Sequence, residues 1–326
     1  MQSVLVYGRF LTRALLNGVY NYSSSTEAAV NRKRERDFRL LTAACGFPKV
    51  SSRFSARLSR GRYGDDASFF ARYKTADVLG VADGVGGWRD YGFDPSRFSY
   101  SLMETCERLV VTGRFNPRSP GNLIANSYYE LKENKDQIVG SSTACVVVLN
   151  RTDQMLYTAN IGDSGFLVMR NGEVVHRSEE QQHTFNTPFQ LCLPPANITG
   201  VHSDSPESAD TSSVPIEEGD LILLATDGLF DNLPESVIVQ QLANLRDPNL
   251  DNMQNMVNTL AFLAHRLAFD ANYLSPFAKR AWENGINILG GKPDDVTVLL
   301  AAVTNLFNES APIPAVIAQR SCSDHG

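Results

Sequence analysis

Acidic residues recur along this chain where short apolar runs begin or end. They are Asp83, Asp163 and Asp227, each directly after an apolar run, and the pairs Asp65-Asp66 and Asp294-Asp295, each directly before one. A single Asp-Gly is most often only a turn. Several carboxylates at the strand ends of one core would instead meet in one cleft, where their pKa values rise unless a cation neutralises them.

The residue types at these positions suit hard divalent cations. Gly84 and Gly228 follow Asp83 and Asp227, and a glycine lets the backbone approach a ligand closely. Oxygen-only ligand sets favour Mg²⁺ or Mn²⁺, and no paired Cys/His set indicates zinc. Two such ions about 4 Å apart activate a water and hold a phosphoryl group for in-line attack. The pattern therefore permits metal-assisted hydrolysis of a phosphate ester.

The composition narrows the class of protein. The 326 residues carry 36 acidic and 30 basic side chains, a formal net charge of −6, which argues against binding nucleic acid through a basic surface. The five cysteines are scattered and form no C-x-x-C pair, so we expect a reducing compartment. No apolar run approaches the roughly 18–20 residues of a membrane span. We expect a monomer with no nucleic-acid partner and no membrane span.

The apolar periodicity predicts a mixed α+β fold. Residues 143–177 are typical of an antiparallel meander containing a hairpin at Asn171-Gly172, and 199–215 of a surface loop. The predicted strands outside the meander are 78–82, 221–226 and 296–303, and the predicted helices are 99–111, 120–132, 234–245 and 251–269. We expect one catalytic domain with a mostly antiparallel β core and helices outside it.

The first residues have the composition of a targeting segment. Residues 1–26 contain Arg9 and Arg13 but no acid, allow an amphipathic helix, and end in a run of serines. This composition is typical of a mitochondrial transit peptide. We therefore expect residues 1–40 to be a transit segment and linker that direct the protein to the mitochondrial matrix. We expect residues 41–304 to be the catalytic domain and residues 305–326 to be a mobile tail.

Six motifs together resemble a known family. YGDDASF, VLGVADGVGGW, GSSTACVVVL, TANIGDSGFLV, LILLATDGLFDN and KPDDVTVLL occur in this order over about residues 60–303. The set resembles the metal-dependent protein phosphatases (PPM, type 2C), and VADGVGGWRDYG with EEQQHTFNTPFQL resembles their mitochondrial branch. The resemblance implies a four-layer fold, a central antiparallel β-sandwich flanked by α-helices on both faces. It also implies phosphorylated protein substrates, with phosphoserine and phosphothreonine hydrolysed by a metal-bound hydroxide without a phosphoenzyme.

The resemblance also implies ligands for two Mn²⁺ or Mg²⁺ ions. By motif, Asp83 bridges both ions and Gly84 binds one of them through its backbone carbonyl. Asp227 and Asp294 complete the ligands of one ion. Asp65 takes the place of a family glutamate on the other ion, one methylene shorter, so that its contact could run through water.

Further roles follow from the same motifs. Asp66 would orient metal-bound water, which makes Asp83, Asp227 and Asp66 the implied catalytic residues. Asp163 resembles the ligand of a third, weaker metal ion. Asp231 would position water or a neighbouring ligand.

The sequence departs from the family pattern at two further points. Val85 stands where the family commonly has a histidine that protonates the leaving group. Gly61 stands where the family has a phosphate-binding arginine, with Arg60 and Arg62 as its neighbours. These departures keep one alternative open, a low-activity pseudophosphatase that acts as a binding module. A phosphatase of a small phosphoester would share the whole site and is the second alternative.

Overall fold

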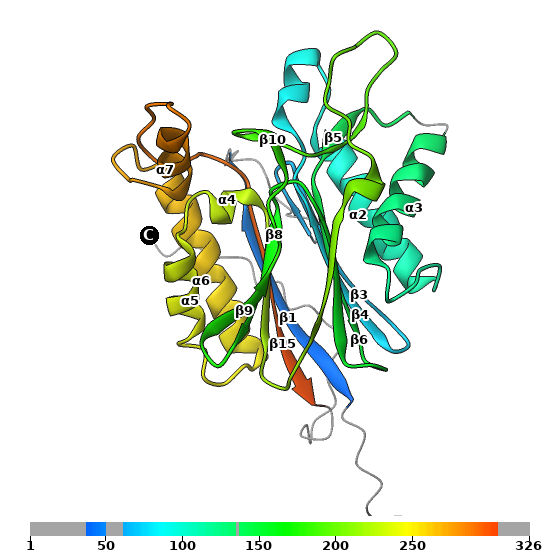
Figure 1. Ribbon diagram of the computed structural model, residues 1–326, viewed down its shortest axis with the longest axis vertical. Helices are drawn as coiled ribbons and strands as arrows, with labels where there is room; N and C mark the ends of the chain where they lie inside the picture. Colours follow the sequence, from blue (N-terminus) through cyan, green and yellow to red (C-terminus); the bar gives the residue numbers. More distant parts are fainter. Residues whose placement is uncertain (1–36, 50–60, 135–136, 306–326) are drawn as a thin grey trace, which may run out of the picture.

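The computed structural model describes residues 37–49, 61–134 and 137–305 (Figure 1). Apart from residues 37–40, the expected transit segment lies outside these ranges. So do Arg60 and all of the expected tail except Asn305. None of the described helices is both long and apolar enough to cross a membrane.

Two antiparallel sheets form the centre of the protein. The five-stranded sheet has the order β1 (Phe38–Phe47), β15 (Val296–Asn305), β14 (Leu221–Ala225), β8 (Gly165–Arg170) and β9 (Glu173–Arg177). The six-stranded sheet has the order β13 (Asp210–Pro215), β7 (Met155–Ile161), β6 (Ala144–Asn150), β4 (Ala76–Ala82), β3 (Asp66–Tyr73) and β2 (Arg62–Tyr63). Two short pairs join β10 (Gln182–Thr184) to β11 (Thr187–Pro188) and β12 (Leu191–Leu193) to β5 (Gly140–Ser142).

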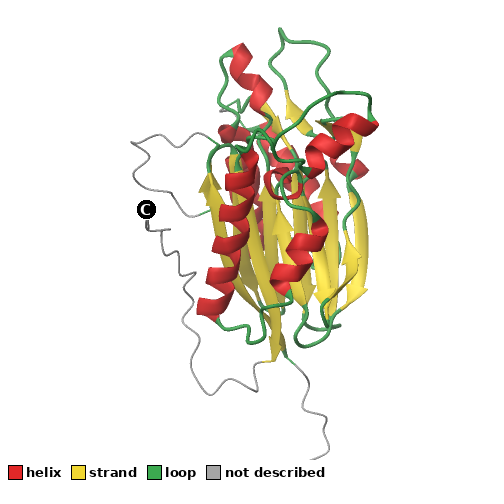
Figure 2. Ribbon diagram, turned by 90° about the vertical axis from the view of Figure 1, so that its left-hand side faces the viewer, coloured by secondary structure: helices red, strands yellow, loops and turns green. Residues whose placement is uncertain are grey.

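Helices cover the outer face of each sheet (Figures 1 and 2). The six-stranded sheet packs against α2 (Ser96–Val111) and α3 (Pro120–Glu133). The five-stranded sheet packs against α4 (Asp227–Phe230), α5 (Glu235–Leu242) and α6 (Leu250–Ala268). The remaining helices are α7 (Pro276–Glu283) and two 3₁₀ turns, η1 (Gly86–Tyr91) and η2 (Pro206–Ser208). The expected α+β fold, a β-sandwich between two helical layers, is confirmed.

The layers explain why several strands are apolar along their whole length. In β6, Val147 and Leu149 point into the core between the two sheets, whereas Val146 and Val148 point into the core beneath α2 and α3. A strand that is covered on both faces has no solvent side, so its sequence does not alternate between apolar and polar residues. Strands β4, β14 and β15 show the same division between two cores.

The structure corrects the predicted meander and loop. Residues 143–177 do not form one sheet, because β6 and β7 belong to the six-stranded sheet and β8 and β9 to the five-stranded one. Gly162, with φ 101°, lies in the connection that crosses from one sheet to the other. The hairpin at Asn171 and Gly172 is confirmed, with φ 52° and 86°. Part of the expected surface loop, Asp210–Pro215, pairs with β7 as β13.

The tight contact of Gly228 with β15 generates a stability prediction. A Cβ atom on Gly228 would lie 2.0 Å from the carbonyl oxygen of Asp295, whereas one on Gly87 would have no atom within 4 Å. We expect Gly228→Ala to lower the free energy of unfolding by about 1–3 kcal/mol, because the backbone must shift to admit the methyl group. Gly87→Ala is the matched control and should change it by less than about 0.5 kcal/mol. Urea denaturation checks this, and equal stability of the two variants would contradict the packing described.

Candidate metal centre

Antiparallel pairing brings the predicted carboxylates to one end of the sandwich. Strand β3 begins where its partner β4 ends, so Asp66, the first residue of β3, lies beside Asp83, which follows β4. Strand β15 begins beside the end of β14, so Asp294 lies near Asp227. Carboxylates that are 17 residues apart (Asp66 and Asp83) and 67 residues apart (Asp227 and Asp294) in sequence thus meet at neighbouring strand ends.

Asp66 joins the two sheets through its carboxylate. Its Oδ2 accepts hydrogen bonds from the hydroxyls of Thr226 and Thr297, both at 2.7 Å. The aspartate belongs to the six-stranded sheet, and the two threonines lie at the ends of β14 and β15 in the other sheet. Asp66 is fully buried, and its Oδ1 has no hydrogen-bond partner among the described residues. One oxygen therefore fixes the orientation of the side chain and leaves the other free.

The backbone around Asp83 is held by the neighbouring strand connection. The Asp83 N–H donates to Thr143 Oγ1 at 3.0 Å, and the Thr143 N–H donates back to the Asp83 carbonyl at 3.0 Å. The Gly84 N–H donates to the Asp65 carbonyl at 3.2 Å. A Cβ atom on Gly84 would lie only 2.8 Å from the Pro95 carbonyl oxygen. Glycine is therefore needed for this close approach of three chain segments.

A lysine lies among the carboxylates of the five-stranded sheet. The Lys292 ammonium is 2.6 Å from Asp231 Oδ2 and 3.6 Å from Asp294 Oδ2, and it forms a short ion pair with Asp227 Oδ2. The second oxygen of Asp227, Oδ1, is buried without a hydrogen-bond partner among the described residues. Asp231 also pairs with Arg280. No motif in the sequence predicts a role for this lysine.

The Asp65 carboxylate is bound by an arginine. Arg89, in η1, donates to Asp65 Oδ2 at 2.5 Å and to Oδ1 at 2.7 Å, a bidentate pair. The Asp65 N–H donates to Asp295 Oδ2 at 2.6 Å, so the second aspartate of the KPDD motif positions this turn. The side chain of Arg89 is 59% exposed, so the guanidinium is open to solvent at the edge of the centre.

The acidic residues strongly influence one another's ionisation. Burial raises the pKa of Asp83, and the charges of Asp227, Asp66 and Asp294 raise it further. Burial and Asp227 raise the pKa of Asp294 to about 7. Burial also favours the neutral form of Asp227, but its ion pair with Lys292 outweighs this effect and lowers its pKa. The carboxylates that the sequence singles out therefore converge closely enough to disfavour their full ionisation.

These residues fit a divalent cation in donor type and charge. The converging carboxylates offer only oxygen donors, two of these oxygens are buried and unpartnered, and the excess negative charge is balanced only in part by Lys292. Within the described ranges, no three His, Cys, Asp or Glu side chains already have the spacing of a closed metal cage. The ammonium of Lys292 lies between three of the carboxylates instead.

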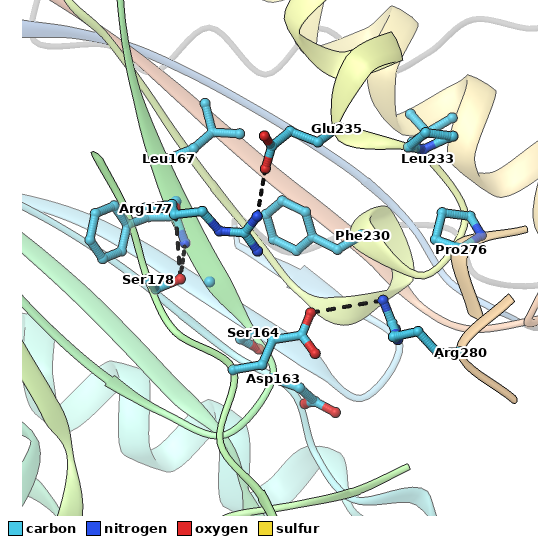
Figure 3. A pocket seen from close by; sticks show the side chains of 14 residues that line it. Asp163, Ser164, Leu167, Arg177, Ser178, Phe230, Leu233, Glu235, Pro276 and Arg280 are labelled. Carbon is cyan, nitrogen blue, oxygen red and sulfur yellow. Dashed lines mark hydrogen bonds and ion pairs between the residues drawn. The ribbon is translucent and has the colours of Figure 1, made fainter. Parts of the chain in front are cut away.

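Asp163 borders a pocket beside this centre (Figure 3). It lies in the loop that crosses between the sheets, and burial, followed by the charge of Asp227, raises its pKa. The pocket has a volume of ≈ 160 Å³. Its two arginines are neutralised by carboxylates, since Arg177 pairs with Glu235 at 2.7 Å and Arg280 pairs with Asp231. The pocket therefore has no surplus positive charge for an anion.

The positions that depart from the family pattern have defined surroundings. The N–H of Val85 donates to the Ser141 carbonyl at 3.0 Å, and its side chain has no proton to give. Arg62 pairs with Glu104 and lies 4.7 Å from the centre of the Tyr100 ring, so its guanidinium is already engaged. The structure thus identifies two cations without a predicted role, Arg89 and Lys292. Both stand inside the quoted motifs, in GGWRDYG and KPDD, which is the only signal the sequence offered.

Comparisons with known sequences identify the family of the chain. The family described as protein phosphatase 2C matches residues 55–261. The protein phosphatase PTC7 homolog of Homo sapiens is 55% identical over 305 residues, covering 93% of this chain and 98% of the relative. The protein phosphatase PTC7 homolog fig of Drosophila ananassae is 49% identical over 269 residues, covering 81% of this chain and 80% of the relative.

Solved structures show the same fold. The photosystem II phosphatase PBCP has a TM-score of 0.68 and 27% identity, and the match covers 82% of this chain and 99% of that one. A serine/threonine phosphatase of S. agalactiae has a TM-score of 0.52 and 16% identity, over 81% of this chain and 99% of that one, and supports the fold alone. The chain therefore belongs to the protein phosphatase 2C family of metal-dependent protein phosphatases.

Proposed function

We propose that the chain hydrolyses phosphoserine and phosphothreonine in proteins and that its acidic cluster holds two divalent cations, Mg²⁺ or Mn²⁺. The observation that carries this proposal is the pair of buried, unpartnered carboxylate oxygens, Asp66 Oδ1 and Asp227 Oδ1, in a cluster with excess negative charge. The residues proposed to hold the ions are Asp83, the carbonyl of Gly84, Asp227, Asp294 and Asp65, with Asp163 holding a third, weaker ion. When bound, these ions supply positive charge to the phosphate and acidify water for direct attack on phosphorus.

The chain's own residues would orient the reaction. Asp66, anchored by two threonines at 2.7 Å, keeps one oxygen available to accept a proton or hydrogen bond from water. Asp231 holds Lys292 and Arg280 at the rim of the cluster. Val85 cannot protonate the leaving group, so we propose that solvent supplies that proton.

We propose that Arg89 receives the substrate phosphate, in place of the arginine that the family has four residues before the Asp65 position. Its planar guanidinium suits the bidentate binding of phosphate, and it already binds an anion, the Asp65 carboxylate, next to Gly84. Because Arg89 is largely exposed, it is able to turn from Asp65 to an incoming phosphoester. The Asp65 carboxylate would then be free to bind the second ion.

We propose that the catalytic domain begins at Phe38. Strand β1 pairs with β15 in continuous register from Phe38 opposite Asn305 to Phe47 opposite Val296. The segment before it remains the proposed mitochondrial address, supported by Arg9, Arg13 and the absence of acid in residues 1–26.

Chelation and two conservative substitutions test the metal mechanism. We expect hydrolysis of a phosphopeptide to require Mn²⁺ or Mg²⁺ and to stop in EDTA. Asp83→Asn and Asp227→Asn should each lower kcat by at least about a hundredfold, because each loses a charged ligand to the ions. The surface variant Asp251→Asn is the control. Full activity in EDTA or in both site variants would exclude the mechanism, and inactivity with every metal would favour a pseudophosphatase.

Arg89 and Arg62 are distinguished by their effects on KM. Arg89→Ala should raise KM for a phosphopeptide by about tenfold or more, the usual value of a lost charge-assisted hydrogen bond. Arg62 already pairs with Glu104, so Arg62→Ala should leave KM within about twofold of the wild-type value. Steady-state kinetics with saturating Mn²⁺ measures both. The opposite ranking would assign phosphate binding to Arg62.

The address is tested in cells by fusing residues 1–40 to a fluorescent reporter. We expect the fusion to reach mitochondria, because its first 26 residues carry Arg9 and Arg13 and no acid, a composition that suits import. Replacing Arg9 and Arg13 by Glu should abolish this import and is the matched control. A cytosolic distribution of the unmodified fusion would refute the proposal.

A further inference from the structure

Lys292 is built into the metal centre from its backbone outward. Its N–H donates to Asn232 Oδ1 at 2.9 Å, and its carbonyl accepts from Asn232 Nδ2 at 2.9 Å. Asn232 is fully buried, and its Nδ2 also donates to the Gly228 carbonyl at 3.0 Å. The clamp ties Lys292 to the turn that carries Asp227. The side chain is only 17% exposed, so it is not an ordinary solvated lysine.

The head group is held from several sides. Its ammonium lies 2.6 Å from Asp231 Oδ2, 3.6 Å from Asp294 Oδ2 and in a short ion pair with Asp227 Oδ2. The ring of Phe277 lies 5.4 Å away, within range of a cation–π contact. A buried ammonium is costly unless it is paired, and this one is paired with three carboxylates. Two of the three, Asp227 and Asp294, are also proposed to bind divalent ions.

A lysine in this place has two opposing effects on a divalent cation. It reduces the repulsion between Asp227, Asp231 and Asp294, so the carboxylates tolerate one another before an ion binds. It also takes up an Asp227 oxygen, and its charge repels a second cation nearby. The Lys292 ammonium and a divalent ion therefore cannot both use the Asp227 and Asp294 oxygens fully.

Asp231 offers the ammonium an alternative partner. None of the motifs makes Asp231 an ion ligand, and its carboxylate pairs with both Lys292 and Arg280. The ammonium therefore has a carboxylate to stay with when it leaves the other two. Exchange of partners needs movement of the side chain alone, since the backbone of Lys292 is fixed by Asn232.

We propose that Lys292 is an internal counter-cation of the metal centre, which balances Asp227 and Asp294 before a divalent ion binds and competes with that ion for them. The inference rests on the proposed function, because it needs these two aspartates to be ion ligands. Lys292 would thereby weaken metal binding and make the loading of the centre depend on the concentration of free metal. Lys292 would act through the bound ions, which makes it a positioning residue.

Metal affinity without turnover tests the proposal. Isothermal titration of the metal-free protein with Mn²⁺ should show Kd at least about tenfold lower in Lys292→Met than in the wild type, because a competing charge is removed. Lys292→Arg keeps the charge and should stay within about threefold. Lys279→Met, on the exposed face of α7, is the control. A Kd that is unchanged or raised in Lys292→Met would overturn the inference.

Thermal unfolding gives a second readout. Lys292→Met should lower Tm of the metal-free protein, since its carboxylates lose their counter-charge, and saturating Mn²⁺ should remove most of that difference. A lysine that merely packs would lower Tm equally with and without metal, and that result would contradict the proposal. Failure of the wild type to bind Mn²⁺ at all would instead refute the proposed function.

If Lys292→Met does not fold, chemical labelling of the wild-type protein tests the proposal instead. Acetylation by a water-soluble, amine-reactive reagent, followed by mass spectrometry, should label Lys292 slowly in the metal-free protein and at least about fivefold faster with saturating Mg²⁺. An ammonium released from Asp227 and Asp294 is more accessible, and it can lose its proton to give the amine that reacts. Lys279 in the same sample should react equally in both states. Equal protection of Lys292 with and without Mg²⁺ would contradict the exchange.

Discussion

Repulsion between buried carboxylates is the main constraint at one end of the β-sandwich. The carboxylates that meet there are Asp66, Asp83, Asp227 and Asp294. Burial and like charges raise the pKa values of Asp66, Asp83 and Asp294, so a fully ionised cluster without a cation would be unstable. The protein relieves the repulsion by hydrogen bonds from threonines and by the ammonium of Lys292. The oxygens that remain unpartnered are those that a divalent ion would use.

The β-sandwich holds these charged side chains close together despite their repulsion. Antiparallel pairing sets the start of β3 beside the end of β4 and the start of β15 beside the end of β14. Asp66 then links the two sheets through Thr226 and Thr297. Apolar cores on both faces of each sheet hold these strand ends rigidly, so the carboxylates cannot separate by moving apart.

Local signals in the sequence predicted much of this arrangement. An apolar run followed by Asp-Gly marks a strand end whatever the rest of the fold, and the positions of Asp83 and Asp227 were therefore predictable. The helical spacing of apolar residues likewise predicted α2, α3, α5 and α6 to within a few residues. The resemblance to the phosphatase family supplied the layers and the expected roles of the carboxylates.

Long-range relations were not predictable in the same way. Alternation of side chains says nothing about which sheet a strand joins, so the crossing between β7 and β8 was missed, as was β1, which is held by β15 from the other end of the chain. The pairing of Arg89 with Asp65 depends on a contact across 24 residues. The pairing of Lys292 with Asp231 and Asp227 depends on contacts across 61 and 65 residues. Charged residues in a loop give no sign of such partners until the fold brings them together.

The central claim is that the carboxylates at this end of the sandwich form a divalent metal centre. The most direct measurement is an anomalous difference map from crystals grown with Mn²⁺ and measured at the manganese absorption edge. We expect strong peaks beside Asp83 and Asp227, with the Lys292 ammonium no longer in contact with Asp227. Absence of manganese from this cluster in crystals of active protein, or peaks only at surface carboxylates, would contradict it.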